Sequence, residues 1–551
     1  MTESPPTQST HAERDKRRGR SLRGIELPSH KTASTRQPLA PAPLPSQVIL
    51  PLEGGLSARD LRPAIETGQR VLRGQPLVQG GGPLSTWTHA STSGVVRSLE
   101  RRRIAHPRRR EALCAVIDVD GRDEHAPGLA RPDPTQWDTP DKLTLALSRA
   151  GLAGLGGAVF PTGLKLAAAG RHRMRLVILN GAECEPYISC DDMLMRTSPR
   201  DVLAGALVLV ALTGAQRGVV AVEEDKPEAL EALQRELPAL DEHQRLTIET
   251  VRTMYPAGGE RQLIQALTGH EVPSLAKPTD IGYLCQNVGT AAALYRYLAS
   301  GAPVTSRVTT VTGGAVATPR NLDVRLGTRI ADLVTACGGY RDNVARLIMG
   351  GSMMGVALEN DDIPVGRPTN CIVAASAEEL REDAEVACIR CGNCSNVCPA
   401  YLMPQELHAA AKLDQFTALE NLGLFDCIEC GCCDVVCPSH IPLAETFRVG
   451  KRRLVQAMEP NVRVRWLDAR EQLRRQRVER WDREHNGGAG SAAGAGSAAG
   501  AAAGAGSSSG AGAGGEPPAL PARLEAVVEI VERASRLPAA TETSKGEGGN
   551  A

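Results

Sequence analysis

Two copies of one cysteine pattern constrain this chain more than any other feature of its sequence. Each copy reads C-x2-C-x2-C-x3-C and is followed by proline. Thiolates at this spacing hold [4Fe–4S] clusters, and where two copies occur the fourth cysteine of each binds the cluster of the other copy. We therefore predict one cluster on Cys388, Cys391, Cys394 and Cys437, and a second on Cys427, Cys430, Cys433 and Cys398. Zinc is the weaker interpretation, because zinc sites usually pair two C-x2-C knuckles.

The rest of the composition argues against several other classes of protein. The chain holds 15 cysteines, but residues 1–36 have no apolar leader, so a secreted disulfide scaffold is not expected. The longest apolar run, 202–215, is shorter than the roughly 20 residues that span a membrane, which favours a soluble or peripheral protein. Lys plus Arg and Asp plus Glu are both 63, so the net charge indicates no nucleic-acid partner.

At 551 residues, the chain is long enough for about three or four domains. Changes in composition and in hydrophobic period mark the boundaries between its regions. We predict a disordered basic tail (1–25), a β-rich domain (26–135), an α/β domain (136–302), a second β-rich domain (303–376), the cluster domain (377–450), an Arg-rich helix (451–486), and a linker rich in Gly, Ala and Ser with a short amphipathic segment (487–551). That segment is either a docking helix or a frayed tail, and deleting 486–551 is expected to leave the cofactors in place.

A glycine-rich loop at 154–165 leads into a short predicted helix of the α/β domain. Small residues let backbone N–H groups approach a phosphate, the helix N-terminus favours the negative charge, and Lys165 can pair with it. The loop differs from the dinucleotide fingerprint, which directly follows a strand and has an acidic residue about 20 positions later. The loop alone therefore predicts a phosphate-bearing ligand without identifying it.

Several segments together resemble a known family. The loop at 154–165 is similar to the FMN-binding loop of the NADH-binding flavoprotein subunit of respiratory complex I, and the chain resembles the C subunits of Rnf electron-transport complexes more closely still. The matching segments are 154–166, 179–196 (LNGAECEPYISCDDMLMR), 221–229 (AVEEDKPEA), 255–260 (YPAGGE) and 278–291, and the two cysteine runs follow in the family's order. The resemblance extends over residues 22–450.

The resemblance implies a site for FMN and NADH. It implies that FMN is cradled by Gly154, Gly156, Gly157 and Lys165 and is contacted by Asn287 and Thr290. It implies that the nicotinamide nucleotide is held in part by Phe160. It further implies an acidic segment beside both ligands, formed by Asn180, Glu183 and Glu185, and a second nucleotide-side loop, formed by Gly258, Gly259 and Glu260. No residue is expected to act as a catalytic acid or base. One position departs from both families, because Val159 stands where they usually have glycine and adds a β-branched side chain to a tight loop.

The resemblance also implies a fold and a set of partners. It implies a multidomain α/β and α+β protein, with a barrel-sandwich hybrid at 26–135, a complex-I-flavoprotein-like α/β domain at 136–302, a soluble-ligand-binding β-grasp module at 303–376 and an α-helical, bacterial-ferredoxin-like dicluster domain at 377–450. The implied function is a peripheral translocase subunit that passes electrons between NADH, FMN and two [4Fe–4S] clusters, to or from ferredoxin. Its partners would be the other Rnf subunits, including the ferredoxin-like subunit and the membrane subunits, at the cytoplasmic face of the bacterial inner membrane.

Three other functions stay open at this point. A cobalamin reductase of bacterial microcompartments shares this architecture but has another acceptor, whereas the N-terminal sandwich domain disfavours a diaphorase module of a soluble hydrogenase or formate dehydrogenase. The third alternative is a non-catalytic electron relay with an inactive nucleotide site, which Val159 supports. Two basic stretches, 101–110 and 463–483, are either solvated surfaces or docking surfaces.

Overall fold

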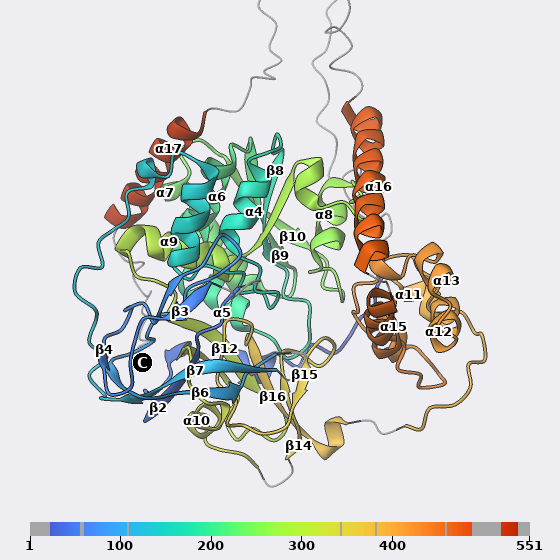
Figure 1. Cartoon of the computed structure of the whole chain (residues 1–551), viewed down its shortest axis with the longest axis horizontal. Coiled ribbons are helices and arrows are strands. Elements are labelled where there is room, and N and C mark those ends of the chain that lie inside the picture. The colour runs from blue at the N-terminus through green and yellow to red at the C-terminus, as the bar shows by residue number, and fades with distance from the viewer. Residues whose placement is uncertain are drawn as a thin grey trace, which may run out of the picture.

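The computed structural model describes residues 23–55, 60–106, 110–341, 344–380, 383–457, 460–486 and 519–537. Figure 1 shows a larger part, built of sheets and the helices around them, and a smaller helical part beside it. The long helix α16 (Pro460–Asn486) rises from the smaller part along one side of the larger part. The predicted basic tail lies outside the described residues except for its last three positions, as does most of the predicted linker.

A four-stranded parallel sheet forms the centre of the α/β region. Its strands, in spatial order, are β10 (Leu246–Val251), β9 (Arg217–Glu223), β8 (Leu176–Gly181) and β11 (Tyr283–Asn287). The two central strands are almost continuously apolar, as is usual for strands covered on both faces. The helices of this region are α3 (Pro140–Arg149), α4 (Thr162–Ala169), α5 (Cys190–Thr197), α6 (Pro199–Thr213), α7 (Pro227–Leu240), α8 (Glu260–Thr268) and α9 (Val288–Ser300). The predicted alternation of strands and helices is confirmed.

Helix α6 is apolar on all its faces because other elements cover it on all sides. It packs against the sheet, against α9 and against a C-terminal helix, α17 (Leu520–Arg536). From α17, the side chains of Leu524, Val527 and Val531 are at most 1% exposed. Of the two interpretations of the amphipathic segment near the C-terminus, the docking helix is therefore the one that the structure confirms (Figure 1).

The first β-rich region is an antiparallel sheet with a small two-stranded sheet beside it. The larger sheet has the order β2 (Gln47–Pro51), β7 (Glu111–Val119), β6 (Gly94–Arg103) and β4 (Arg70–Val71), and the smaller one pairs β3 (Leu61–Pro63) with β5 (Val78–Gly80). The alternation of apolar and polar residues at 70–78 predicts one β segment, but this segment is divided between the two sheets. The chain turns at Gly74, whose φ of 85° suits glycine, and the N–H of Gln75 donates to the carbonyl of Leu72.

The second β-rich region is a mixed six-stranded sheet. Its order is β1 (Ala40–Pro41), β13 (Arg320–Arg325), β12 (Ser306–Thr312), β16 (Cys371–Ser376), β14 (Val344–Met349) and β15 (Val356–Leu358). Helix α10 (Ile330–Ala336) packs on it, and the short helix α2 (Thr32–Thr35) lies against β12 and β13. The N-terminal segment thus contributes an edge strand to a sheet built from residues far along the chain.

The smaller part holds both cysteine runs. Its helices are α11 (Asn393–Val397), α12 (Pro404–Lys412), α13 (Phe416–Asn421), α14 (Cys432–Val435) and α15 (Leu443–Ala457), and they share one small apolar core. No helix within the described ranges is both long and apolar enough to cross a membrane.

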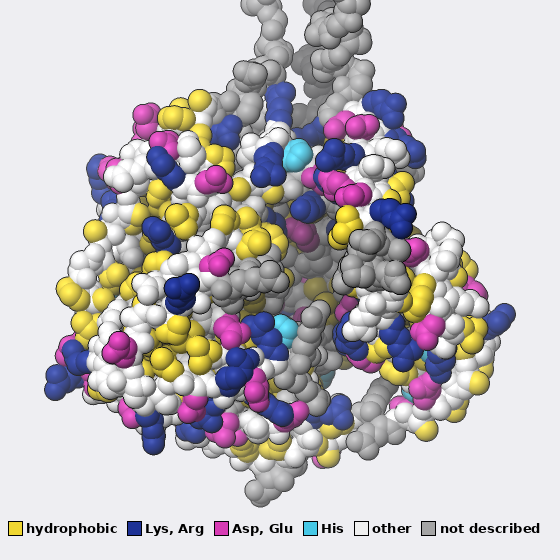
Figure 2. Space-filling view, viewed as in Figure 1, with side chains coloured by type: hydrophobic (Ala, Val, Ile, Leu, Met, Phe, Trp, Pro, Cys, Tyr) yellow, Lys and Arg dark blue, Asp and Glu magenta, His cyan; other side chains and the backbone are white. Residues whose placement is uncertain are grey.

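Helix α16 connects the two parts through its own side chains. Trp481 is 5% exposed in the core beneath the parallel sheet, and Arg474 pairs with Asp280 there and with Glu471 on its own helix. Figure 2 shows basic and acidic side chains intermixed over this helix. Part of the Arg-rich stretch therefore packs against the α/β domain and holds the cluster domain against it.

Candidate redox site

The carboxyl ends of the parallel strands bring most of the predicted flavin residues together. Ligands of α/β proteins bind at this edge of the sheet. Asn180 and Asn287 are register partners at the ends of β8 and β11, and residues 258–260 follow β10. The Asn180 amide donates to the carbonyl of Gly258 over 2.8 Å, which ties two of the predicted segments directly to each other.

The glycine-rich loop closes on itself and rests on the start of α9. The N–H of Gly154 donates to the carbonyl of Phe160 over 2.9 Å, and the N–H of Leu155 donates to Thr290 Oγ1 over 2.9 Å. A Cβ atom on Gly156 would lie only 3.1 Å from Asn287 Cβ, so only glycine fits without displacement. Gly157 has φ 103° and faces open space. A closed loop with a free face, followed at once by the N-terminus of α4, fits the phosphate and ring edge of FMN.

Val159 has a backbone conformation that glycine enters more readily than valine. Its φ is 51°, in the left-handed region that β-branched residues rarely enter. The loop therefore stores local strain at this residue.

Lys165 and Phe160 flank this loop. The Lys165 ammonium donates to Glu260 Oε1 over 2.7 Å and to the carbonyl of Cys285 over 2.5 Å, so two predicted site residues meet as an ion pair. The Phe160 ring is 42% exposed, which leaves it open for stacking. Gly259 is the residue that precedes α8, and Glu260 is the first residue of that helix.

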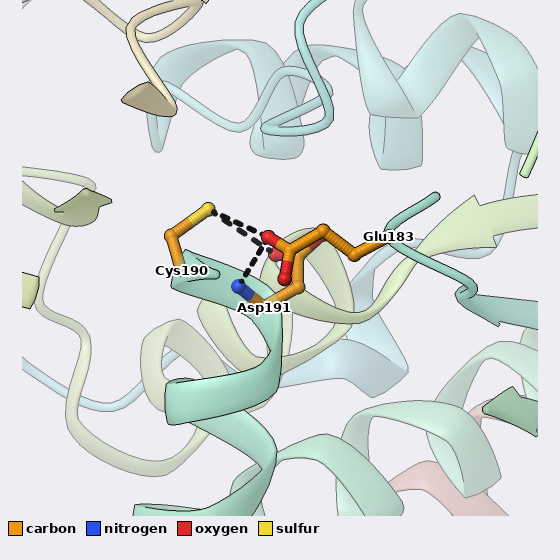
Figure 3. Close-up of side chains that lie close together, drawn as sticks. All are labelled: Glu183, Cys190 and Asp191. Atoms are coloured by element: carbon orange, nitrogen blue, oxygen red, sulfur yellow. Dashed lines mark hydrogen bonds between the residues drawn. The ribbon is translucent and has the colours of Figure 1, made fainter. Parts of the chain in front are cut away.

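Glu183, one of the predicted site residues, lies in a largely buried cluster with Cys190 and Asp191 (Figure 3). At the start of α5, the N–H groups of Asp191 and Asp192 donate to the Glu183 carboxylate, the first over 2.9 Å. The Asn287 amide donates to Asp191 over 2.5 Å. The thiol of Cys190 points at the same carboxylates. Burial and the Glu183 charge raise the pKa of Asp191 to about 7, although the Asn287 hydrogen bond lowers it. Sequence reasoning missed Asp191, although it lies inside the matching segment 179–196.

Glu185 binds a turn of the six-stranded sheet. Its carboxylate accepts from the N–H groups of Met353 and Met354, over 3.0 and 2.7 Å, in the turn between β14 and β15. Burial raises the pKa of Glu185, although these two donors lower it. This residue joins the α/β region to the six-stranded sheet, and its place beside FMN and NADH stays a prediction.

A second missed feature is a buried ion pair just beyond β9. The side chain of Lys226 is 1% exposed and that of Glu223 is 0% exposed, and the two are in contact. Lys226 also donates to Asp225 over 2.8 Å. Burial raises the pKa of Glu223, and the Lys226 charge opposes that rise. The matching segment 221–229 contained these residues, but nothing in the sequence indicated that both are buried.

The eight cysteines of the two runs line two separate pockets. One pocket is bounded by Cys388, Cys391, Cys394 and Cys437, and the other by Cys398, Cys427, Cys430 and Cys433. Each group takes three cysteines from one run and the fourth from the other, as the crossed pattern of ligation requires. The backbones also repeat: Arg390 and Glu429 have φ 56° and 58°, and the glycines two positions later are likewise left-handed. The donor sets therefore fit two cubane clusters.

Tyr255 connects the second pocket to the flavin side. Its hydroxyl donates to the carbonyl of Cys430 over 2.6 Å, and its own carbonyl lies against the thiol of Cys432. Three residues later, Gly258 bonds to Asn180 and to the sulfur of Cys184. One short segment thus touches both predicted redox sites.

Four family models match the chain. They are the RnfC barrel sandwich hybrid domain over 20–122, the Nuo51 FMN-binding domain over 147–296, the SLBB domain over 308–357 and the 4Fe-4S dicluster domain over 386–441. They confirm the predicted fold class, and they confirm FMN and [4Fe–4S] clusters as the predicted cofactors. Two crystal structures of an NAD+-reducing [NiFe]-hydrogenase, air-oxidised and H2-reduced, match at 19% identity with TM-scores of 0.42 and 0.40, covering 62% and 61% of this chain and 65% and 64% of those chains.

Three similar curated proteins share one name, which describes each as the C subunit of an ion-translocating oxidoreductase complex. The protein from Pseudomonas aeruginosa is 42% identical over 83% of this chain and 58% of its own length. One from Vibrio cholerae is 40% identical over 73% of this chain and 52% of its own, and one from Klebsiella pneumoniae is 40% identical over 83% and 60%. The chain therefore spans less than two thirds of the length of these relatives. Over the residues that it shares with them, it belongs to the family of C subunits of ion-translocating oxidoreductase complexes.

Proposed function

We propose that this protein is a peripheral electron-transfer subunit of a membrane-bound ion-translocating oxidoreductase, with NADH, FMN and two [4Fe–4S] clusters in series. The observation that carries the proposal is the segment from Tyr255 to Gly258, which bonds to a cluster loop at one end and to a flavin-side residue at the other. Without such a link, the two cofactor sites would be unrelated features of one chain.

The chain's own residues divide the work of binding. The backbone of the loop at 154–157 and the start of α4 would hold the FMN phosphate. Thr290 fixes that loop against α9, and Asn287 caps the start of α9. Lys165 would balance the phosphate charge after release from Glu260, and Phe160 would stack on the nicotinamide nucleotide. When bound, FMN supplies the exchange between a two-electron hydride donor and one-electron clusters.

The order of the clusters follows from their surroundings. The pocket formed by Cys398 and the second cysteine run lies against Tyr255 of the α/β region, and we call its cluster the inner cluster. The other pocket opens on the surface through the exposed Cys388 and Cys391, and we call its cluster the outer cluster. Electrons from NADH would reach the inner cluster first, and a reduced ferredoxin could drive the reverse flow from the outer one.

The membrane attachment is part of the proposal. The name of the relatives supports association with further subunits, and membrane subunits of the complex would supply the ion path. This chain would lie on the cytoplasmic face of the inner membrane.

The experiment is an anaerobic titration of the full chain, reconstituted with FMN and clusters, with NADH. Bleaching of flavin absorbance together with EPR signals of reduced clusters is the expected result. Cluster signals with dithionite but none with NADH would refute the proposal and favour the electron relay without a working nucleotide site.

Tyr255→Phe sharpens this test, because it removes only the hydroxyl that binds the Cys430 carbonyl. The expected results are a shifted midpoint potential of the inner cluster and slower reduction of that cluster by NADH. Tyr283→Phe is the matched control, because Tyr283 is equally buried at 3% exposure and its hydroxyl bonds to His270, away from both pockets. If both variants behave alike, the proposed route through Tyr255 is wrong.

A further inference from the structure

The two cysteine runs give the cluster domain an internal two-fold repeat, and its two halves can be compared position by position. The first loop reads C-I-R-C-G and the second reads C-I-E-C-G. Both loops have the same sequence of left-handed residues, so their side chains project from equivalent backbones. Any difference in burial between equivalent positions therefore comes from what covers each loop.

The α/β region covers the inner loop. Ile428 packs in a buried cluster with Tyr255, and Cys430 is 7% exposed. Pro399, which follows the fourth ligand of the inner cluster, is buried, and its carbonyl accepts from Gln262 of α8. The face of this half of the repeat is thus filled by an electron-transfer contact within the chain.

The equivalent face of the other half is open. Ile389, the counterpart of Ile428, is 68% exposed, and Pro438, the counterpart of Pro399, is exposed. Val386 is 55% exposed and lies beside Pro438, because its N–H donates to the carbonyl of Ser439 over 3.0 Å. We call this surface the outer rim and define it by Val386, Cys388, Ile389, Arg390, Cys391 and Pro438.

The charges differ between the halves in a way that selects the partner. Glu429 of the inner loop is neutralised within the chain by Lys451, over 2.7 Å, and by Arg448, over 3.0 Å. Its counterpart Arg390 is exposed, and no carboxylate of the described residues pairs with it. A second copy of the chain that docked rim to rim would set Arg390 against Arg390, which is unfavourable. An acidic partner would complete the ion pair.

We propose that the outer rim is the docking surface of an acidic iron–sulfur protein, which covers the outer cluster as the α/β region covers the inner one. The inference rests on the proposed function. One electron passes from the reduced cluster to the oxidised cluster of the partner, or in reverse, and no bond is made or broken.

The test measures electron transfer from the full, reconstituted chain to a bacterial ferredoxin with two [4Fe–4S] clusters, used as the probe, in a stopped-flow spectrometer. Val386→Glu and Arg390→Glu each place negative charge on the rim and should slow ferredoxin reduction by about tenfold or more at low salt. Leu413→Glu is the matched control, because Leu413 is 67% exposed at the end of α12 in the same domain but outside the rim. It should transfer electrons at the rate of the unaltered chain.

Two readouts separate this inference from the proposed function. NADH titration of Val386→Glu reports whether NADH still reduces the clusters of the variant. If NADH does not reduce the clusters, docking can still be tested with a chain that has been reduced with dithionite and freed of excess reductant. Equal rates for the rim variants and Leu413→Glu would overturn the inference, as would no transfer to ferredoxin from a chain with reduced clusters. A dimer that Val386→Glu disrupts, or binding to anionic lipid vesicles that Arg390→Glu abolishes, would assign the rim to another occupant and would also overturn it.

Discussion

The buried ion pair beyond β9 tests how the ends of the parallel strands are held. Lys226→Met keeps most of the length of the side chain and removes its charge, so the Glu223 carboxylate is left without its partner. One oxygen of that carboxylate already has no hydrogen-bond partner in the described structure. Breaking a buried pair in this way lowers the free energy of unfolding by about 3–5 kcal/mol, whereas an exposed pair contributes about 1 kcal/mol or less.

The loss should depend on pH in one direction. Without the Lys226 charge, which opposes burial most strongly, the pKa of Glu223 is held further above the unfolded value of about 4.3, although the Lys31 charge still lowers it. A carboxyl group whose pKa is raised by folding weakens the fold as the pH rises through that folded pKa. The difference between Lys226→Met and the unaltered chain should therefore be smallest near about pH 4 and largest above neutrality.

Urea unfolding, followed by tryptophan fluorescence with the buried Trp137 of the α/β region among the four reporters, measures this loss. Lys142→Met is the matched control, because Lys142 pairs with Asp138 on the surface, with both side chains more than half exposed. The double variant Glu223→Gln, Lys226→Met should recover most of the stability. The reasoning is refuted if Lys226→Met loses no more than Lys142→Met, or if the double variant is as unstable as the single one.

Three further changes have defined outcomes. Val159→Gly should bind FMN more tightly, by up to about tenfold in a fluorescence titration, because it removes a left-handed strain of about 1–2 kcal/mol from the bound loop. In urea titrations of the unaltered chain, the free energy of unfolding should fall by up to about 4 kcal/mol from about pH 4 to above pH 7, because Asp191 ionises over this range. Asp191→Asn should remove this fall. Removing residues 487–551 should lower the melting temperature by at least about 5 °C, because α17 buries five apolar side chains, whereas ending the chain after residue 537 should not.

For each of these three changes, one outcome would contradict the expected result. Weaker FMN binding by Val159→Gly would mean that the valine side chain itself supports the site, with Val159→Ala as the variant that separates strain from contact. A pH profile of Asp191→Asn that matches the unaltered chain would show that Asp191 does not titrate in this range. Unchanged melting of the shortened chain would show that α17 contributes little to the core that it covers.

Local patterns made the cluster site predictable. Ligands at fixed spacing, such as those from Cys388 to Cys398, bind one metal centre because a short loop determines where they lie, so the cysteine runs predicted both pockets. The two central strands of the parallel sheet were equally clear, because runs such as 219–222 are apolar and short. The segment 70–78 was harder, since a single left-handed glycine divides it between two sheets.

Residues whose role depends on distant neighbours were not predictable in the same way. Lys226 and Asp191 look like ordinary surface charges in the sequence, and only the packing of the fold buries Lys226 against Glu223 and brings Asp191 against Glu183. Tyr255 gains its role from Cys430, a contact between residues 175 positions apart. For Glu185 the family pattern predicts a place beside the flavin, but nothing in the sequence predicted its hydrogen bond to a turn of another sheet.

The opposite charges at equivalent positions of the repeat imply a slope of reduction potential along the chain. A guanidinium beside a cluster stabilises the added electron, and so does exposure to water, and the outer cluster has both through Arg390 and its open rim. The inner cluster has a buried setting and a carboxylate, Glu429, whose charge is cancelled by Lys451 and Arg448. Electrons entering from NADH would then run downhill toward the surface, and only a strong reductant at the rim could push them back.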